Sequence, residues 1–189
     1  MDKTLFRSLA LVGPLAILAI VAGCSPQPDG ELKLQAGDEA RPEVILRKFR
    51  LGTDDADRRL AQAVYDDGLA VMTRQAAPEL RWGPAYKAFC YSAQLHPTSQ
   101  SLWRCADVLV GSAQGMTGPE APALRRAVLW RIAMLFTSAL VLDQFDRGLT
   151  TEQRAQAQRD RDCIADYLSD HHGYRPRCGT AALLIDQAE

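Results

Sequence analysis

The stretch ALRRAVLWRIAMLFTSALVL, residues 123–142, is the most apolar part of the chain beyond its first 23 residues. From Val128 onward it is interrupted only by Arg131, Thr137 and Ser138. A membrane span is the obvious alternative, but a span needs about 20 consecutive apolar residues, and Arg131 shortens the run. A helix that is apolar almost all round usually lies buried at the centre of a bundle. The stretch therefore predicts a central core helix.

Helix-start signals recur along the rest of the chain. They are Pro at a first helical position, Ser, Thr or Asp at an N-cap, and a capping box formed by Thr150 and Gln153. Helices are predicted to begin at Pro42, at Thr53 or Asp54, at Pro84, at Thr98 or Ser99, at Ala123, at Thr150 and at Thr180. A strand at Val44–Leu46 is the alternative to the first helix. No segment shows convincing period-two alternation, so the predicted fold class is all-α, a bundle of helical hairpins.

Several side chains have expected places in such a bundle. We expect Leu60, Val64, Val71 and Met72 to face inward, and Trp82, Trp103 and Trp130 to pack in the core rather than form a ligand cage. We expect His96 to be exposed or to cap a helix C-terminus. The run Asp54, Asp55 and Asp57 is interpreted as a helix N-terminal charge pattern. Arg154, Arg159 and Arg161, with Glu152, Asp160 and Asp162, are interpreted as a solvated face.

Composition limits the classes of partner. The chain has 189 residues, 47% of them hydrophobic, and a formal net charge of −1. This is enough apolar material for a sizeable core. There is no basic excess to neutralise phosphates, so we expect no nucleic-acid partner and no electrostatic attraction to anionic lipid.

The N-terminus has the layout of a secretory signal. Lys3 and Arg7 precede the apolar run 9–23, and the tetrad Val21-Ala22-Gly23-Cys24 closes it. An uncleaved anchor is the alternative, but the run is short and contains Gly13-Pro14. The tetrad resembles the lipobox of bacterial lipoprotein precursors.

This resemblance implies a processing route and a location. Residues 1–23 would be a signal peptide, removed after a diacylglyceryl group is attached to the Cys24 thiol, and the new amine would then be acylated. Two or more acyl chains suffice for stable membrane anchoring. Ser25, in the position where Asp would retain the protein in the inner membrane, favours the outer membrane with the domain facing the periplasm. Residues 24–42, rich in Pro, Gly, Asp and Gln, are predicted to be a flexible tether, and residues 43–189 a single helical domain.

The other four cysteines are then interpreted for an oxidising compartment. Cys90, Cys105, Cys163 and Cys178 make an even set, which predicts two disulfides with three possible connectivities. We favour Cys90–Cys105 and Cys163–Cys178. A metal site built from Cys163, His171, His172 and Cys178 is the alternative, but adjacent histidines rarely converge on one ion. We therefore expect neither a metal nor another cofactor.

Residues 85–103 resemble part of a tetratricopeptide repeat. Ala85, Phe89, Ser92 and Pro97 match the second half of that motif, and Trp103 stands where the next repeat would begin. The resemblance implies paired helices whose small residues allow close approach. The preceding helix has Thr73 where the motif has Gly, and the phase is lost after Trp103. The match covers about one repeat, so a degenerate array and an ordinary helical bundle are both open.

No established catalytic motif is present. The nearest candidate is the segment from Asp162-Cys163 to His171-His172, which faintly resembles disulfide-bonded phospholipases, although His171 and His172 fall at a helix end. Two functions follow as hypotheses. The first is a non-catalytic, lipid-anchored interaction or assembly factor with a protein partner in the cell envelope. The alternative is a periplasm-facing hydrolase that acts on lipid or peptidoglycan through His171 or His172.

Overall fold

The structure is a computed structural model that describes residues 32–74, 78–117, 120–169 and 179–186. All described residues belong to one compact unit, Glu31–Glu189. The elements are η2 (Asp38–Ala40), α1 (Pro42–Leu51), α2 (Asp55–Thr73), α3 (Pro78–Leu95), α4 (Ser99–Gln114), α5 (Ala121–Asp146), α6 (Thr151–Leu168) and α7 (Ala182–Asp186). No strand occurs in the described part of the chain, so the predicted all-α class is confirmed and α1 replaces the alternative strand.

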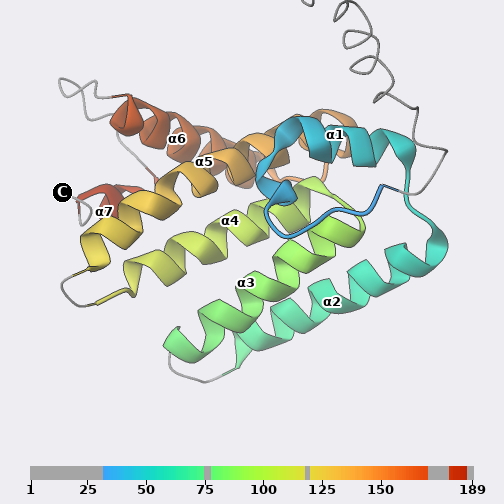
Figure 1. Ribbon diagram of the computed structural model, residues 1–189, viewed down its shortest axis with the longest axis horizontal. Helices are drawn as coiled ribbons and strands as arrows, with labels where there is room; N and C mark the ends of the chain where they lie inside the picture. The colour runs from blue at the N-terminus through green and yellow to red at the C-terminus, as the bar shows by residue number, and fades with distance from the viewer. Residues whose placement is uncertain (1–31, 75–77, 118–119, 170–178, 187–189) are drawn as a thin grey trace, which may run out of the picture. The chain divides into compact units, whose positions relative to one another are not determined.

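Helices that follow one another in the sequence lie side by side. From α2 to α6, each helix packs against the next, and Figure 1 shows α2, α3, α4 and α5 arranged in chain order. Helices α1 and α6 both pack on α5, and α7 contacts α4, α5 and α6. The arrangement makes α5 the helix with the most neighbours, as its apolar composition predicts.

Short polar motifs fix several helix starts. The Asp54 carboxylate accepts a hydrogen bond from the backbone N–H of Asp57 at 2.7 Å, which confirms the capping interpretation of this acidic run. Thr98 and Ser101 form a reciprocal capping box at the start of α4. Thr150 and Gln153 form the predicted box at the start of α6.

The predicted helix start at Pro84 is wrong. Helix α3 begins at Pro78 and continues through Pro84. A proline inside a helix removes one backbone hydrogen bond. Here the turns that follow bury Ala85 and Phe89 completely, and this burial compensates for the lost bond.

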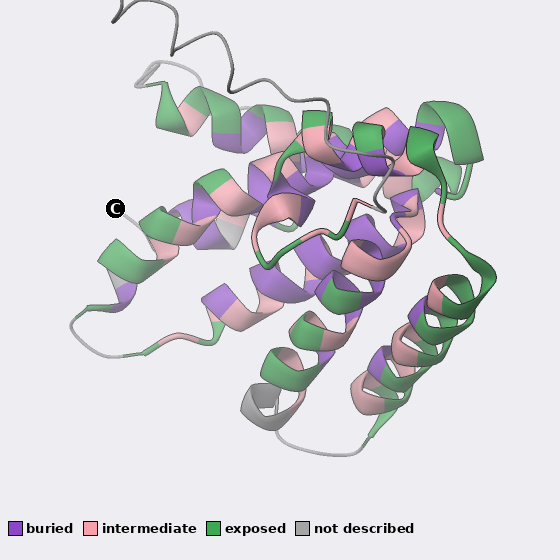
Figure 2. Ribbon diagram, turned by 45° about the vertical axis from the view of Figure 1, so that its right-hand side comes forward, coloured by how far each residue is buried: buried purple, intermediate pink, exposed green. Residues whose placement is uncertain are grey.

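Helix α5 forms the predicted centre of the core. Leu129, Ile132, Leu135, Phe136 and Leu142 are all fully buried. Figure 2 shows buried residues concentrated on α3, α4 and α5, whereas α2 is mostly exposed or intermediate. Within the described ranges, only residues Ala123–Asp146 make a helix long and apolar enough to cross a membrane, and half of its most apolar window is buried inside the fold.

Two of the predicted core residues are not in the core. Trp130 is 55% exposed and Leu60 is 45% exposed. Trp130 points away because α5 is covered by α4 and α6 on other sides, and no described helix packs over this side chain. Of the other two tryptophans, Trp103 is buried and Trp82 is half-buried.

Glycine–aromatic contacts bring the first helices close together. A Cβ at Gly68 on α2 would lie 2.8 Å from Phe89 on α3, and a Cβ at Gly111 on α4 would lie 2.9 Å from Trp82. Any larger residue at these positions would require the facing aromatic ring, or the helix that carries it, to shift. Ser92 adds a buried hydrogen bond to the carbonyl oxygen of Ala61 at 2.9 Å. These are the contacts of helical hairpins, but α2 to α5 range from 16 to 26 residues, and a tetratricopeptide-like array is not confirmed.

The disulfide Cys90–Cys105 joins α3 to α4, as predicted. The two Cα atoms are 5.2 Å apart, and both cysteines are buried. Closing a loop of this length stabilises a fold by about 3 kcal/mol in the chain-entropy model. Cys163 is buried on α6, but Cys178 lies outside the described residues, so the second predicted bridge stays a prediction.

The folded domain begins upstream of the predicted boundary at residue 43. Residues 38–40, assigned to the tether from their composition, form η2, which packs on α3 and α5. Glu39 is fully buried and forms an ion pair with Arg131 of α5. Its carboxylate also accepts hydrogen bonds from Gly37 N–H at 2.8 Å and from the Gln94 amide at 3.2 Å. The partner of Glu39 lies 92 positions away, so composition alone does not reveal this contact.

We expect Glu39→Gln to weaken the domain by about 1–3 kcal/mol, because Arg131 loses its charged partner while the shape of the side chain is kept. Urea unfolding of the purified protein measures the loss. Glu43→Gln is the matched control, since Glu43 is exposed on α1 and its contact with Arg41 is at 3.5 Å. Equal midpoints for the two variants would contradict a stabilising role for the buried pair.

Candidate functional site

Most of the residues predicted from sequence to carry function fall outside the described part of the chain. This applies to Cys24, His171, His172 and Cys178. The proposed lipidation, the metal alternative and the hydrolase alternative therefore stay predictions. Within the described ranges, no group of three or more His, Cys, Asp or Glu side chains is placed to hold a metal ion.

His96 is not exposed, but the C-capping alternative is confirmed, because its backbone N–H donates to the carbonyl oxygen of Ser92 in the last turn of α3 at 2.9 Å. It follows the last residue of α3 and is half-buried, and its Nδ1 atom lies 3.1 Å from Oγ1 of Thr53 in the α1–α2 connection. Burial, reinforced by the positive charges of Arg58 and Lys48, lowers the pKa of the imidazole. His96 thus links the α1–α2 connection to the α3–α4 connection, a structural role.

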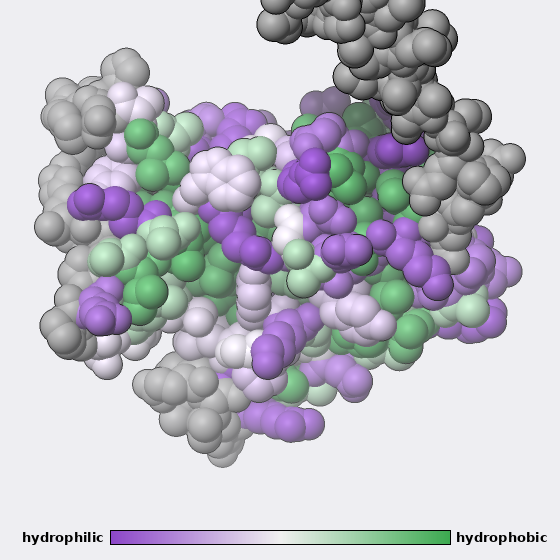
Figure 3. All heavy atoms as spheres, in the orientation of Figure 1, coloured by the Kyte–Doolittle hydropathy of each residue, from purple (hydrophilic) through white to green (hydrophobic). Residues whose placement is uncertain are grey.

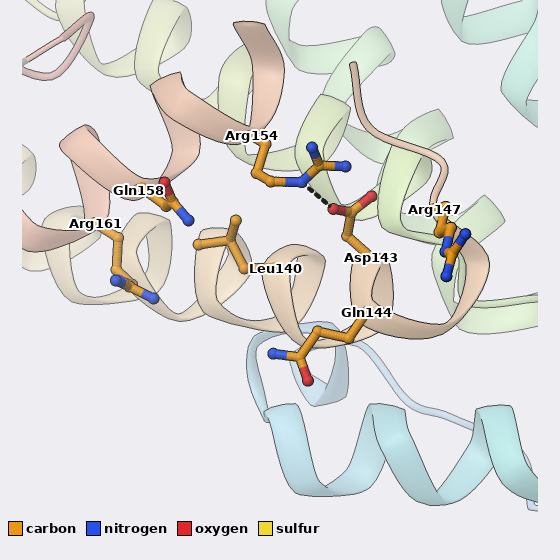
Figure 4. Close-up of a pocket in the computed structure, with 7 residues that line it drawn as sticks. All are labelled: Leu140, Asp143, Gln144, Arg147, Arg154, Gln158 and Arg161. Carbon is orange, nitrogen blue, oxygen red and sulfur yellow. Dashed lines mark hydrogen bonds and ion pairs between the residues drawn. The ribbon is translucent and has the colours of Figure 1, made fainter. Parts of the chain in front are cut away.

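The described residues contain a pocket of about 380 Å³ between α5 and α6. Leu140, Asp143, Gln144 and Arg147 line it from α5 and its C-terminal end. Arg154, Gln158 and Arg161 line it from α6 (Figure 4). We call this set the arginine pocket.

The buried carboxylate of Asp143 forms one wall of the arginine pocket. One oxygen accepts from Nε of Arg154 at 2.5 Å, and the other accepts from the backbone N–H of Leu149 at 2.9 Å. Arg154 also donates to the carbonyl oxygen of Leu149 at 3.2 Å. The hydrogen bond that Arg154 donates to Asp143, and the negative charge of that carboxylate, raise the pKa of the Arg154 guanidinium. Asp143 and Arg154 together fix the turn between α5 and α6.

The other two arginines are not tied to the interior. Arg147 follows the last residue of α5 with φ of 51°, and it is the one non-glycine with positive φ among the residues that the structure describes. Such a conformation costs on the order of 1 kcal/mol or more and tends to persist at functional sites. Arg161 contacts the carboxylate of Asp162 at 2.7 Å, at the surface of the domain.

The solvated-face interpretation of α6 is therefore wrong in part. Asp160 is fully buried, and Arg154 and Arg161 line a pocket rather than a uniform surface. A spacing of seven residues places Arg154 and Arg161 on the same face of a helix, and this signal was present in the sequence. The sequence does not indicate that Asp143 is the buried partner of Arg154, because Asp143 belongs to the preceding helix.

A second polar cluster joins α4, α6 and the C-terminal helix. The Asp160 carboxylate accepts from the Thr180 hydroxyl at 2.7 Å and from the backbone N–H of Ala181 at 3.1 Å. Asp107 of α4 accepts from the Gln156 amide at 3.4 Å. Burial, and to a smaller degree the charge of Asp160, raises the pKa of Asp107. These hydrogen bonds tie the segment at the start of α7 to α6.

Comparisons with protein-family models, with curated proteins and with solved structures give no match to this chain. Its function is therefore argued from its own residues.

We expect Asp107→Asn to raise the melting temperature at pH 7. The folded state raises the pKa of Asp107 above the value of about 3.9 for an unfolded chain. The stability associated with this group is therefore greatest at low pH and is lost as pH rises through the folded-state pKa. The gain over the wild type should shrink as pH falls toward 4. Asp67→Asn, at an exposed position of α2, is the control, and a pH-independent difference for Asp107→Asn would contradict this account.

Proposed function

We propose that this protein is a bacterial lipoprotein, anchored by acyl chains on Cys24 to the outer membrane and facing the periplasm. It acts there as a non-catalytic interaction or assembly factor. The observation that carries the location is the order of features at the N-terminus. Lys3 and Arg7 precede an apolar run of the length of a signal peptide, and Val21-Ala22-Gly23-Cys24 closes it.

The disulfide Cys90–Cys105 supports an oxidising compartment. Disulfides form and persist in secreted and periplasmic proteins and are rare in the cytosol. This bridge clamps two neighbouring helices of the core, where both sulfurs are buried. A crosslink at the centre of the fold suits a domain that folds after export.

An exposed apolar stripe on α5 supports the interaction role. Ala123, Ala127, Trp130 and Met134 share one face of the helix, and all four are exposed or half-exposed. Figure 3 shows apolar side chains gathered over the first half of α5. An exposed tryptophan within an apolar stripe is typical of a protein contact surface.

Cys24→Ala should abolish acylation, because the thiol that accepts the diacylglyceryl group is lost. Labelling with radioactive palmitate, followed by fractionation of the membranes, measures this directly. The wild type should carry label and sediment with the outer membrane, and an inhibitor of the lipoprotein signal peptidase should leave a larger precursor. A Cys24→Ala protein that still incorporates palmitate would overturn the proposal.

We expect Trp130→Ala to weaken capture of the partner without unfolding the domain, because this side chain is more than half exposed. Crosslinking in intact cells, followed by affinity purification in detergent, compares the proteins recovered with the wild type and the variant. Leu60→Ala on α2 is the matched control, since Leu60 is also large, apolar and exposed. Identical recovery with both variants would count against the stripe as a contact surface.

A further inference from the structure

The arginine pocket carries positive charge that the chain itself does not balance. Three guanidinium groups and one carboxylate line it, and that carboxylate, Asp143, already pairs with Arg154. Arg147 has no carboxylate partner among the described residues. Asp146, beside it in the sequence, instead accepts from Ser99 and Gly148.

Arg161 can exchange its present partner, the Asp162 carboxylate, for a carboxylate of a ligand. Its partner Asp162 is 63% exposed, and exposed pairs are worth little because water screens both charges. A ligand carboxylate that is partly shielded inside the pocket would compete well for this guanidinium. Arg147 and Arg161 are thus the two positive groups available to a ligand.

The positions of these groups favour an extended ligand. Figure 4 shows Arg161 and Arg147 toward opposite ends of the pocket, with Leu140 and the Arg154–Asp143 pair between them. A ligand with acidic groups at intervals can contact both.

The rest of the lining suits a polypeptide. The amide groups of Gln144 and Gln158 each offer a donor and an acceptor, which match the N–H and C=O groups of a peptide backbone. Sulfate offers acceptors alone, and hydrogen phosphate adds only an O–H donor. Leu140 adds an apolar contact at the centre.

We propose that the arginine pocket binds an acidic segment of a partner protein, with Arg147 and Arg161 each receiving a carboxylate. This inference rests on the proposed function in taking a protein as the partner. The positive φ of Arg147 is in accord with it, since the strained conformation keeps a cationic side chain beside the pocket where glycine would be easier to accommodate.

The test measures fluorescence polarisation of a labelled oligoglutamate peptide with the full chain, purified in an uncharged detergent at low salt. Oligoglutamine of the same length is the neutral control. The wild type should bind oligoglutamate and not oligoglutamine, and added salt should weaken the complex. Arg147→Gln combined with Arg161→Gln should weaken binding about tenfold or more.

Two further variants separate binding from folding. Arg159→Gln removes an exposed arginine of α6 that does not line the pocket, and it should bind like the wild type. Arg147→Gly removes the charge and relieves the positive φ, so it should bind more weakly without a lower melting temperature. Equal losses for Arg159→Gln and for the double variant would overturn the proposal, as would displacement of the peptide by inorganic phosphate at the same concentration.

The outcome is independent of the lipidation experiment. Peptide binding by a protein that carries no acyl chains would refute the location and keep the acidic ligand. An acylated protein that binds oligoglutamate and oligoglutamine equally would refute the ligand and keep the location.

Discussion

The burial of α5 is the constraint on which the rest of the structure depends. This helix of 26 residues has apolar side chains on most of its circumference, and a single neighbour cannot cover them. Arg131 of α5 is only partly buried, with 33% of its side chain exposed, and it lies beside the fully buried Glu39. Glu39 of η2 forms an ion pair with Arg131, and this contact holds the segment before α1 against α5. A buried charge without its partner would be costly, which makes these two residues interdependent.

The layer formed by α2, α3 and α4 is built on a different principle. Here helices approach closely because glycine faces an aromatic ring, at Gly68 with Phe89 and at Gly111 with Trp82. The disulfide between α3 and α4 then holds the middle pair together. Close packing leaves the side chains between these helices unavailable to a partner. We therefore propose that a partner binds outside this layer, at the exposed stripe of α5 and at the arginine pocket between α5 and α6.

Local signals in the sequence predicted what depends on nearby residues. The capping box at Thr150, the Asp54 cap and the apolar centre of α5 were all predictable because each involves residues within a turn or two. Contacts between residues far apart in the sequence were not predictable in this way. Pro84 predicts a helix start from its own residue type, but burial of Ala85 and Phe89 stabilises a helix that continues through it. Trp130 is predicted in the core because it is large and apolar, but it is 55% exposed. The pocket was missed for the same reason, since a charged face of α6 becomes a pocket only when Asp143 and Arg147 lie across from it.

The disulfide has a consequence for the order in which the domain matures. Cys90 and Cys105 are neighbouring cysteines in the chain and sit on successive helices. In a polypeptide that emerges with its N-terminus first, both thiols appear before residue 163. If the Cys24 thiol is acylated as proposed above, Cys90 and Cys105 are the first two free thiols to emerge. Oxidation in order of appearance then gives the native pair directly, without reshuffling of a wrong one. The disulfide between α3 and α4 can therefore form before α6 has emerged.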